Sequence, residues 1–172
     1  FARSSAGAGD YAVSRAPITA DSLAALTGAQ LRTRVRAGEI TGPTAGMARG
    51  FVQTNLVILP RAWADEFAEF CRLNPRPCPL VARTEPGDPE PKQAAPGADL
   101  RTDVPRYRVF RDGIAERDEP TSIAELWNDD LTGFLLGCSF TFETALLQAG
   151  LEVRHVTRGS NVPMYRTSLA CQ

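Results

Sequence analysis

Apolar side chains recur at helical spacing in the stretch that follows residue 60. Four of them share one helix face, at positions i, i+4, i+7 and i+8: Trp63, Phe67, Phe70 and Cys71. Pro60 suits the first turn of this helix, and Asn74, which precedes a proline, suits its end. The segment Phe51–Leu59 before it is short and rich in β-branched residues. The pattern therefore predicts a strand that leads directly into an amphipathic helix.

Capping motifs and glycines predict three further helices. A Thr-x-x-Gln box begins at Thr27, within a helix predicted over residues 21–37. A Ser-x-x-Glu box begins at Ser122 and predicts a helix that continues to Leu136. The next predicted helix ends at Gly150, because glycine readily adopts the backbone conformation that terminates helices.

Short β-rich segments predict the remaining strands. One covers Pro79–Arg83, and a second covers residues 151–155, where apolar residues alternate with polar ones. Tyr107–Phe110 and Ile114–Arg117 flank an Asp-Gly pair, which is typical of the turn of a β-hairpin. Because strands and helices interleave, we expect an α/β (mixed α+β) fold with a mixed, partly parallel sheet flanked by helices.

The same pattern suggests how the chain is organised. Residues 1–20 lack a continuous apolar run and predict a flexible N-terminal tail rather than a signal peptide. Residues 21–172 then form a single domain, because a chain of 172 residues buries enough surface for one core. The proline-rich stretch 84–99 is expected to fold over this domain, since neither flanking unit can bury a core alone.

Composition narrows the function classes. The formal net charge is -1, so there is no electrostatic sign of a nucleic-acid or membrane partner. No apolar run approaches the length of a membrane span. Lys92 is the only lysine against eighteen arginines, which reflects codon bias or recognition of carboxylates and phosphates by guanidinium groups.

The cysteines and the single histidine argue against a metal site. The four cysteines contain no Cys-x-x-Cys pair, so we expect no metal and no cofactor. Reduced thiols, including Cys71 and Cys78, fit a cytoplasmic protein. His155 is the only histidine, and we interpret it as a half-buried structural residue rather than a catalytic one.

Three polar segments remain as candidates for chemistry. A helix that starts near Ser139 would present free N–H groups, with Glu143 one turn further on the same face. The alternative is that Ser139 caps the helix and Glu143 is a surface acid. The other two segments are 101–108, with alternating donors and acceptors, and 161–167, a polar loop between apolar residues. Their alternatives are a solvated strand edge and an ordinary connection.

Several long segments resemble the D-glutamate cyclase family of hydro-lyases. They are GPTAG (42–46), FVQTNLVILP (51–60), FCRLNPRPCPL (70–80), TEPGDPEP (84–91), PGADLRTDVPRYRV (96–109), WNDDLTGFLLGCSFTFETALLQAG (127–150) and NVPMYRT (161–167). Family members continue past the last of these segments. The resemblance therefore implies that the chain is a fragment, or that a homo-oligomer or a second chain supplies the missing C-terminal segments.

The resemblance implies a cytoplasmic carbon–oxygen lyase that acts on a small amino- or hydroxy-carboxylate in a biosynthetic pathway. The reference reaction is conversion of D-glutamate to 5-oxo-D-proline and water. Nine candidate residues lie on the family-like segments: Cys138, Ser139 and Glu143 for catalysis, and Arg101, Asp103, Tyr107, Asn161, Tyr165 and Arg166 for substrate binding. The alternatives are a hydratase or dehydratase of a biosynthetic pathway, and a non-catalytic carboxylate-binding half that needs a partner chain.

Overall fold

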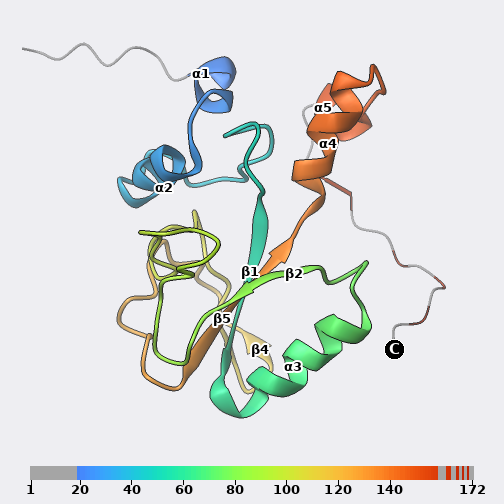
Figure 1. Cartoon of the computed structure of the whole chain (residues 1–172). Helices are drawn as coiled ribbons and strands as arrows, with labels where there is room; N and C mark the ends of the chain where they lie inside the picture. The colour runs from blue at the N-terminus through green and yellow to red at the C-terminus, as the bar shows by residue number, and fades with distance from the viewer. Residues whose placement is uncertain (1–18, 159–161, 164–165, 167, 169, 171–172) are drawn as a thin grey trace, which may run out of the picture.

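The computed structural model describes residues 19–158, 162, 163, 166, 168 and 170. Figure 1 shows the order of its elements: α1 (Ala20–Ala24), α2 (Gly28–Arg36), β1 (Thr54–Pro60), α3 (Arg61–Leu73), β2 (Leu80–Arg83), β3 (Phe110–Arg111), β4 (Ile114–Ala115), β5 (Leu131–Gly137), α4 (Ser139–Gln148) and α5 (Arg154–Thr157). The fold is mixed α+β, as predicted. The predicted flexible tail lies almost wholly outside the described residues.

The main sheet has three strands in the order β1-β5-β2, and both pairings are antiparallel. The prediction of a partly parallel sheet is therefore wrong for the part of the chain that the structure describes. β1, α3 and β2 do form a strand–helix–strand unit whose two strands share one direction. They are not neighbours, however, because β5 inserts between them after a long excursion of the chain.

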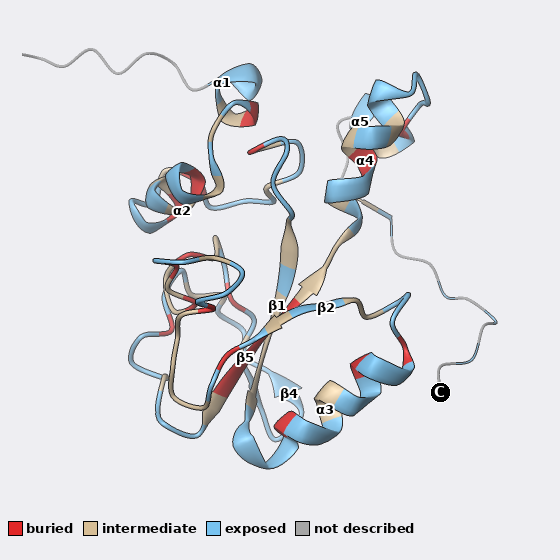
Figure 2. Ribbon diagram, viewed as in Figure 1, coloured by how far each residue is buried: buried red, intermediate tan, exposed pale blue. Residues whose placement is uncertain are grey.

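The prediction of a helix that runs from Ser122 to Leu136 is also wrong. Residues 122–130 form turns, and Leu131–Gly137 is the central strand of the sheet. Four consecutive residues of this strand are buried, as the red segment in Figure 2 shows. A continuous apolar run of this kind does not distinguish a buried strand from a buried helix.

α3 covers one face of the sheet through fewer side chains than its apolar stripe suggests. Phe67 meets Phe134 of β5 edge to face, with ring centroids 5.0 Å apart. Ala64 and Cys71 are buried, whereas Trp63 is 59% exposed. The apolar stripe is therefore only partly covered by the described residues.

α2 packs away from the sheet in a small core of its own. Leu31 and Val35 contact Ile40 and Ala48, which lie in the loop that leads to β1. The predicted helix over 21–37 is divided in two, because Thr27 caps a new helix there with the expected capping box.

Three smaller predictions have different outcomes. The hairpin is confirmed but short, with Asp112 and Gly113 at φ of 50° and 77°, the positive values that a two-residue type I′ turn requires. The strand predicted over residues 151–155 is wrong, because this region leads into α5 instead. Cys71 and Cys78 are free thiols, as predicted.

The proline-rich stretch 84–99 folds back along β5. Thr84 exchanges two hydrogen bonds of 2.9 Å with the backbone of Gly133, and the N–H of Gly87 donates to the carbonyl of Leu131 at 2.8 Å. Trp127 Nε1 donates to the carbonyl of Gly87 at 2.9 Å.

No helix among the described residues is long and apolar enough to span a membrane.

Candidate functional site

A large open cleft of about 990 Å³ lies between α2, β1 and the loop that precedes the hairpin. We call it the main cleft. Its lining includes Leu31, Arg32 and Val35 of α2, Asn55, Leu56 and Ile58 of β1, Leu100, Asp103, Arg106 and Tyr107 of the loop, and Leu135, Cys138, Phe140 and Val162. Most of these side chains are apolar, and the charged ones cluster on the loop side.

Asp103 is the most deeply buried charged group of the main cleft, with a side chain that is 3% exposed. Arg36 contacts it with two guanidinium nitrogens, and Nη2 lies 2.7 Å from Oδ2. Arg32 Nε lies 3.4 Å from the same oxygen, and the N–H of Asp99 donates to it at 2.8 Å. The hydrogen bond to Asp103 raises the pKa of the Arg36 guanidinium.

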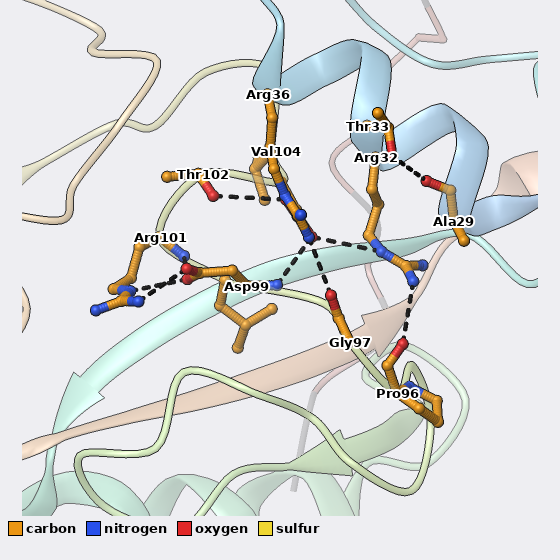
Figure 3. Close-up of polar contacts among 12 residues, drawn as sticks. Ala29, Arg32, Thr33, Arg36, Pro96, Gly97, Asp99, Arg101, Thr102 and Val104 are labelled. Atoms are coloured by element: carbon orange, nitrogen blue, oxygen red, sulfur yellow. Dashed lines mark hydrogen bonds and ion pairs between the residues drawn. The ribbon is translucent and has the colours of Figure 1, made fainter.

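The α2 arginines also anchor the proline-rich loop. Figure 3 shows Arg36 and Arg32 extending from one face of α2 towards that loop. Arg36 Nη2 donates to the carbonyl of Gly97 at 3.0 Å, and Arg32 contacts the carbonyl of Pro96 at 3.5 Å. Asp103 therefore acts as the central acceptor that joins α2 to residues 96–103.

Arg101 is engaged by a different carboxylate. Its Nε and Nη2 donate to the two oxygens of Asp99, each at 2.8 Å. This hydrogen bonding lowers the pKa of Asp99 and raises that of Arg101. Arg101 is not part of the cleft lining. As placed here, it orders the loop rather than facing the main cleft.

Tyr107 lines the main cleft with a buried side chain. Its hydroxyl donates to the carbonyl of Leu100 at 2.8 Å and accepts from the N–H of Val104 at 3.3 Å. Burial raises the pKa of this phenol well above its usual range. The hydroxyl thus closes the 100–107 loop on itself.

The third side of the main cleft comes from the junction of β5 and α4. Gly137 ends β5 where little space is left, since a Cβ there would lie 3.2 Å from Pro79 Cγ. Cys138 is the N-cap residue of α4 and makes no side-chain cap, while its thiol donates to the carbonyl of Gln53 at 3.4 Å. The first N–H groups of α4 therefore begin next to a residue that lines the cleft.

Glu143 lies one turn into α4 and is 8% exposed, so the alternative of a surface acid is wrong. Ser139 Oγ donates to its Oε1 at 3.1 Å, and His155 Nε2 of α5 lies 3.1 Å from Oε2. Neither Ser139 nor Glu143 is among the residues that line the main cleft. Their cluster instead lies behind Cys138, between α4 and α5.

The third predicted segment is described only in part. Asn161 and Tyr165 lie outside the described residues, and Arg166 is exposed and does not line the cleft. Val162 does line it. Each of the three candidate segments therefore contributes a side chain to the main cleft, although several of the charged candidates face elsewhere.

Sequence reasoning assigned no role to Arg32 and Arg36, and it included Arg106 only as part of the candidate segment 101–108. Arg32 and Arg36 stand four residues apart on α2, a spacing that places both on one helix face and offered a signal. Arg106 lines the main cleft, where its Nε donates to the carbonyl of Thr41 at 2.9 Å. His155 was set aside as structural, although it is the only imidazole in the chain.

Comparison with known proteins identifies the sequences that this chain resembles. The sequence profile of the D-glutamate cyclase family matches residues 132–172. A protein of Stutzerimonas stutzeri named "Putative hydro-lyase" is 55% identical over 147 residues, which are 86% of this chain and 55% of that protein. A protein of Rubrobacter xylanophilus with the same name is 57% identical over 143 residues, 83% of this chain and 55% of its own.

The chain is therefore similar to bacterial proteins that are named as hydro-lyases, and its residues 132–172 match the D-glutamate cyclase family. It spans about half the length of the curated relatives it matches.

Proposed function

We propose that this chain is part of a carbon–oxygen lyase that acts on a small amino- or hydroxy-carboxylate in the cytoplasm. Closure of D-glutamate to 5-oxo-D-proline and water is the reaction we favour. The observation that carries this proposal is the 55% identity, over 147 residues, to a relative named as a hydro-lyase. The family profile on residues 132–172 supports the same assignment.

The reaction sets clear chemical demands. A bond forms between the amine nitrogen and the γ-carbonyl carbon, and the bond from that carbon to one oxygen breaks. The ammonium nitrogen loses two protons, and the departing oxygen takes up both and leaves as water. An enzyme must therefore hold the α-carboxylate, carry protons between nitrogen and oxygen, and stabilise the oxyanion that develops.

The main cleft offers a basic wall that would meet the first demand. Three arginines line it against two carboxylates, and those two, Asp103 and Glu119, already accept from Arg36 and Arg108. We therefore assign the α-carboxylate to Arg106, which carries its charge on the cleft wall. Arg166 and Arg101, the arginines first predicted for this role, stay secondary candidates.

The β5–α4 junction supports the other two roles. Uncapped N–H groups at a helix start stabilise negative charge, and those of α4 follow directly on the cleft-lining Cys138. Glu143 is the nearest buried carboxylate to this helix start, and we assign proton transfer to it.

The test is turnover of D-glutamate by the purified chain, with 5-oxo-D-proline measured by chiral chromatography and L-glutamate as the stereochemical control. Arg106→Ala should raise KM, because a charge-assisted hydrogen bond contributes about 1.5–3 kcal/mol, roughly 10- to 150-fold in affinity. Arg117→Ala removes the same charge from an exposed position outside the cleft lining and should change KM little. Equal effects of the two variants would contradict the assignment of Arg106.

A second candidate is a non-catalytic carboxylate-binding half that needs a partner chain. Two observations favour it: the chain spans about half of its relatives, and Glu143 does not line the main cleft. Calorimetry with D-glutamate separates the two candidates. Binding without turnover, followed by turnover when the remaining part of a relative is added, would support this second reading.

A further inference from the structure

The Glu143 carboxylate is contacted at both of its oxygens by side chains from two different helices. Ser139 Oγ, on the preceding turn of α4, donates to Oε1 at 3.1 Å. His155 Nε2, on α5, lies 3.1 Å from Oε2. The side chains of His155 and Glu143 are 13% and 10% exposed, so water screens this contact poorly.

The distance between His155 and Glu143 is that of an ion pair, but the ring N–H is not aligned with the oxygen as in a hydrogen bond. Two lone pairs at this distance would repel each other. A hydrogen on Nε2 is therefore what allows the ring to face the carboxylate oxygen at this distance.

A purely structural role does not explain why polar groups occupy this position. α4 and α5 meet through a carboxylate and an imidazole, although burial of polar groups costs free energy that an apolar pair would not. Neighbouring apolar residues are left outside instead, since Phe142 is 65% exposed and Val156 45% exposed. We expect such an arrangement where a buried carboxylate takes part in a reaction.

We propose that His155 is a positioning residue that holds and orients the Glu143 carboxylate for proton transfer. The inference rests on the proposed function, in which Glu143 carries protons from the amine to the departing oxygen. Ser139 fixes one carboxylate oxygen, and His155 sets the position of the other. The imidazole acts through Glu143 and does not contact the substrate.

Kinetics of two His155 variants test the role. His155→Ala should lower kcat about tenfold or more, since a positioned acid or base contributes 10²–10⁴-fold. KM should stay within about twofold, because the loss concerns the transition state and not binding. His155→Gln keeps an N–H donor close to the position of Nε2 and should restore most of kcat. A kcat of His155→Ala equal to that of the unmodified chain would overturn the proposal.

NMR tests the contact without any need for activity. His155 is the only histidine, so a chain with labelled histidine gives the resonances of this one ring. Glu143→Gln should shift them, whereas Glu152→Gln, an exposed glutamate near α5, should leave them in place. Unchanged resonances in Glu143→Gln would overturn the contact in solution.

The kinetics and the NMR experiment together distinguish failure of the proposed function from failure of the positioning role. Absence of turnover, both in the unmodified chain and after the remaining part of a relative is added, overturns the proposed function and the positioning role with it, while the NMR result still decides whether the contact exists. Turnover that is indifferent to His155→Ala overturns the positioning role alone.

Discussion

Asp103→Asn removes one negative charge from the junction between α2 and the proline-rich loop and leaves the side-chain volume almost unchanged. In the native chain its carboxylate accepts from Arg36 and from the N–H of Asp99, Arg32 Nε lies 3.4 Å from Oδ2, and 3% of the side chain is exposed. The asparagine amide would turn an N–H₂ group towards a guanidinium. Two arginines then lose their common negative charge.

The expected loss follows from this geometry. Hydrogen bonds to charged groups contribute about 1.5–3 kcal/mol each, and the removal of one partner of a fully buried pair costs about 3–5 kcal/mol. The Arg36 and Arg32 side chains are 41% and 23% exposed, so both can turn towards water and recover part of this. We therefore expect the free energy of unfolding to fall by about 2–3 kcal/mol.

Asp65→Asn is the matched control. Asp65 also accepts from an arginine, Arg83, at 2.7 Å, but its side chain is 92% exposed. Both substitutions change the net charge equally, whereas Asp103 is more buried and has more donors around it than Asp65. Because exposed ion pairs contribute little, Asp65→Asn should leave stability almost unchanged. Urea unfolding at pH 7, followed by tryptophan fluorescence and circular dichroism, measures both variants. Equal losses would refute the claim that Asp103 joins α2 to the loop.

Two further changes probe the loop and the cleft wall. Tyr107→Phe should cost about 1–3 kcal/mol at neutral pH, because one buried and one partly buried backbone group lose their partner. Burial raises the pKa of the folded phenol above its unfolded value of about 10, so native stability should fall as pH rises beyond that value, and the variant should lose less in alkaline unfolding. Gly87→Ala should destabilise the protein more than Gly97→Ala does in thermal melts. Both glycines have positive φ, so an alanine at either position costs about 1–2 kcal/mol of backbone strain. Only at Gly87 would the new Cβ meet backbone, 3.0 Å from Asp129 Cα, so equal shifts would contradict the close packing described here.

Residue types and their spacing predict some contacts of the candidate site and not others. Glu143 and its turn partner Ser139 could be paired from their spacing on one helix, and the structure places them in contact. The role of Arg101 could not be judged in this way. Whether a guanidinium faces a cleft or a neighbouring carboxylate depends on the path of the loop, and here Asp99, two residues away, occupies it.

The contact of His155 with Glu143 could not be predicted from the sequence either. Its alternating neighbours predicted a strand, and a histidine on such a strand is usually structural. The structure forms α5 instead and brings the imidazole to a carboxylate twelve positions earlier in the chain. No local pattern encodes that distance, because it depends on how α5 folds back against α4.

What the sequence determined by itself is the set of features whose energetics are local. The Thr27 capping box, the Asp112-Gly113 turn and the helix that begins after Pro60 need only their own side chains and backbone. Tertiary structure decided the identity of Leu131–Gly137 as the central strand, since an apolar run becomes a strand only where two other strands offer it hydrogen bonds. It also decided which arginines meet which carboxylates. Those pairings depend on burial and on distances between segments far apart in the chain, and both arise only once the sheet has formed.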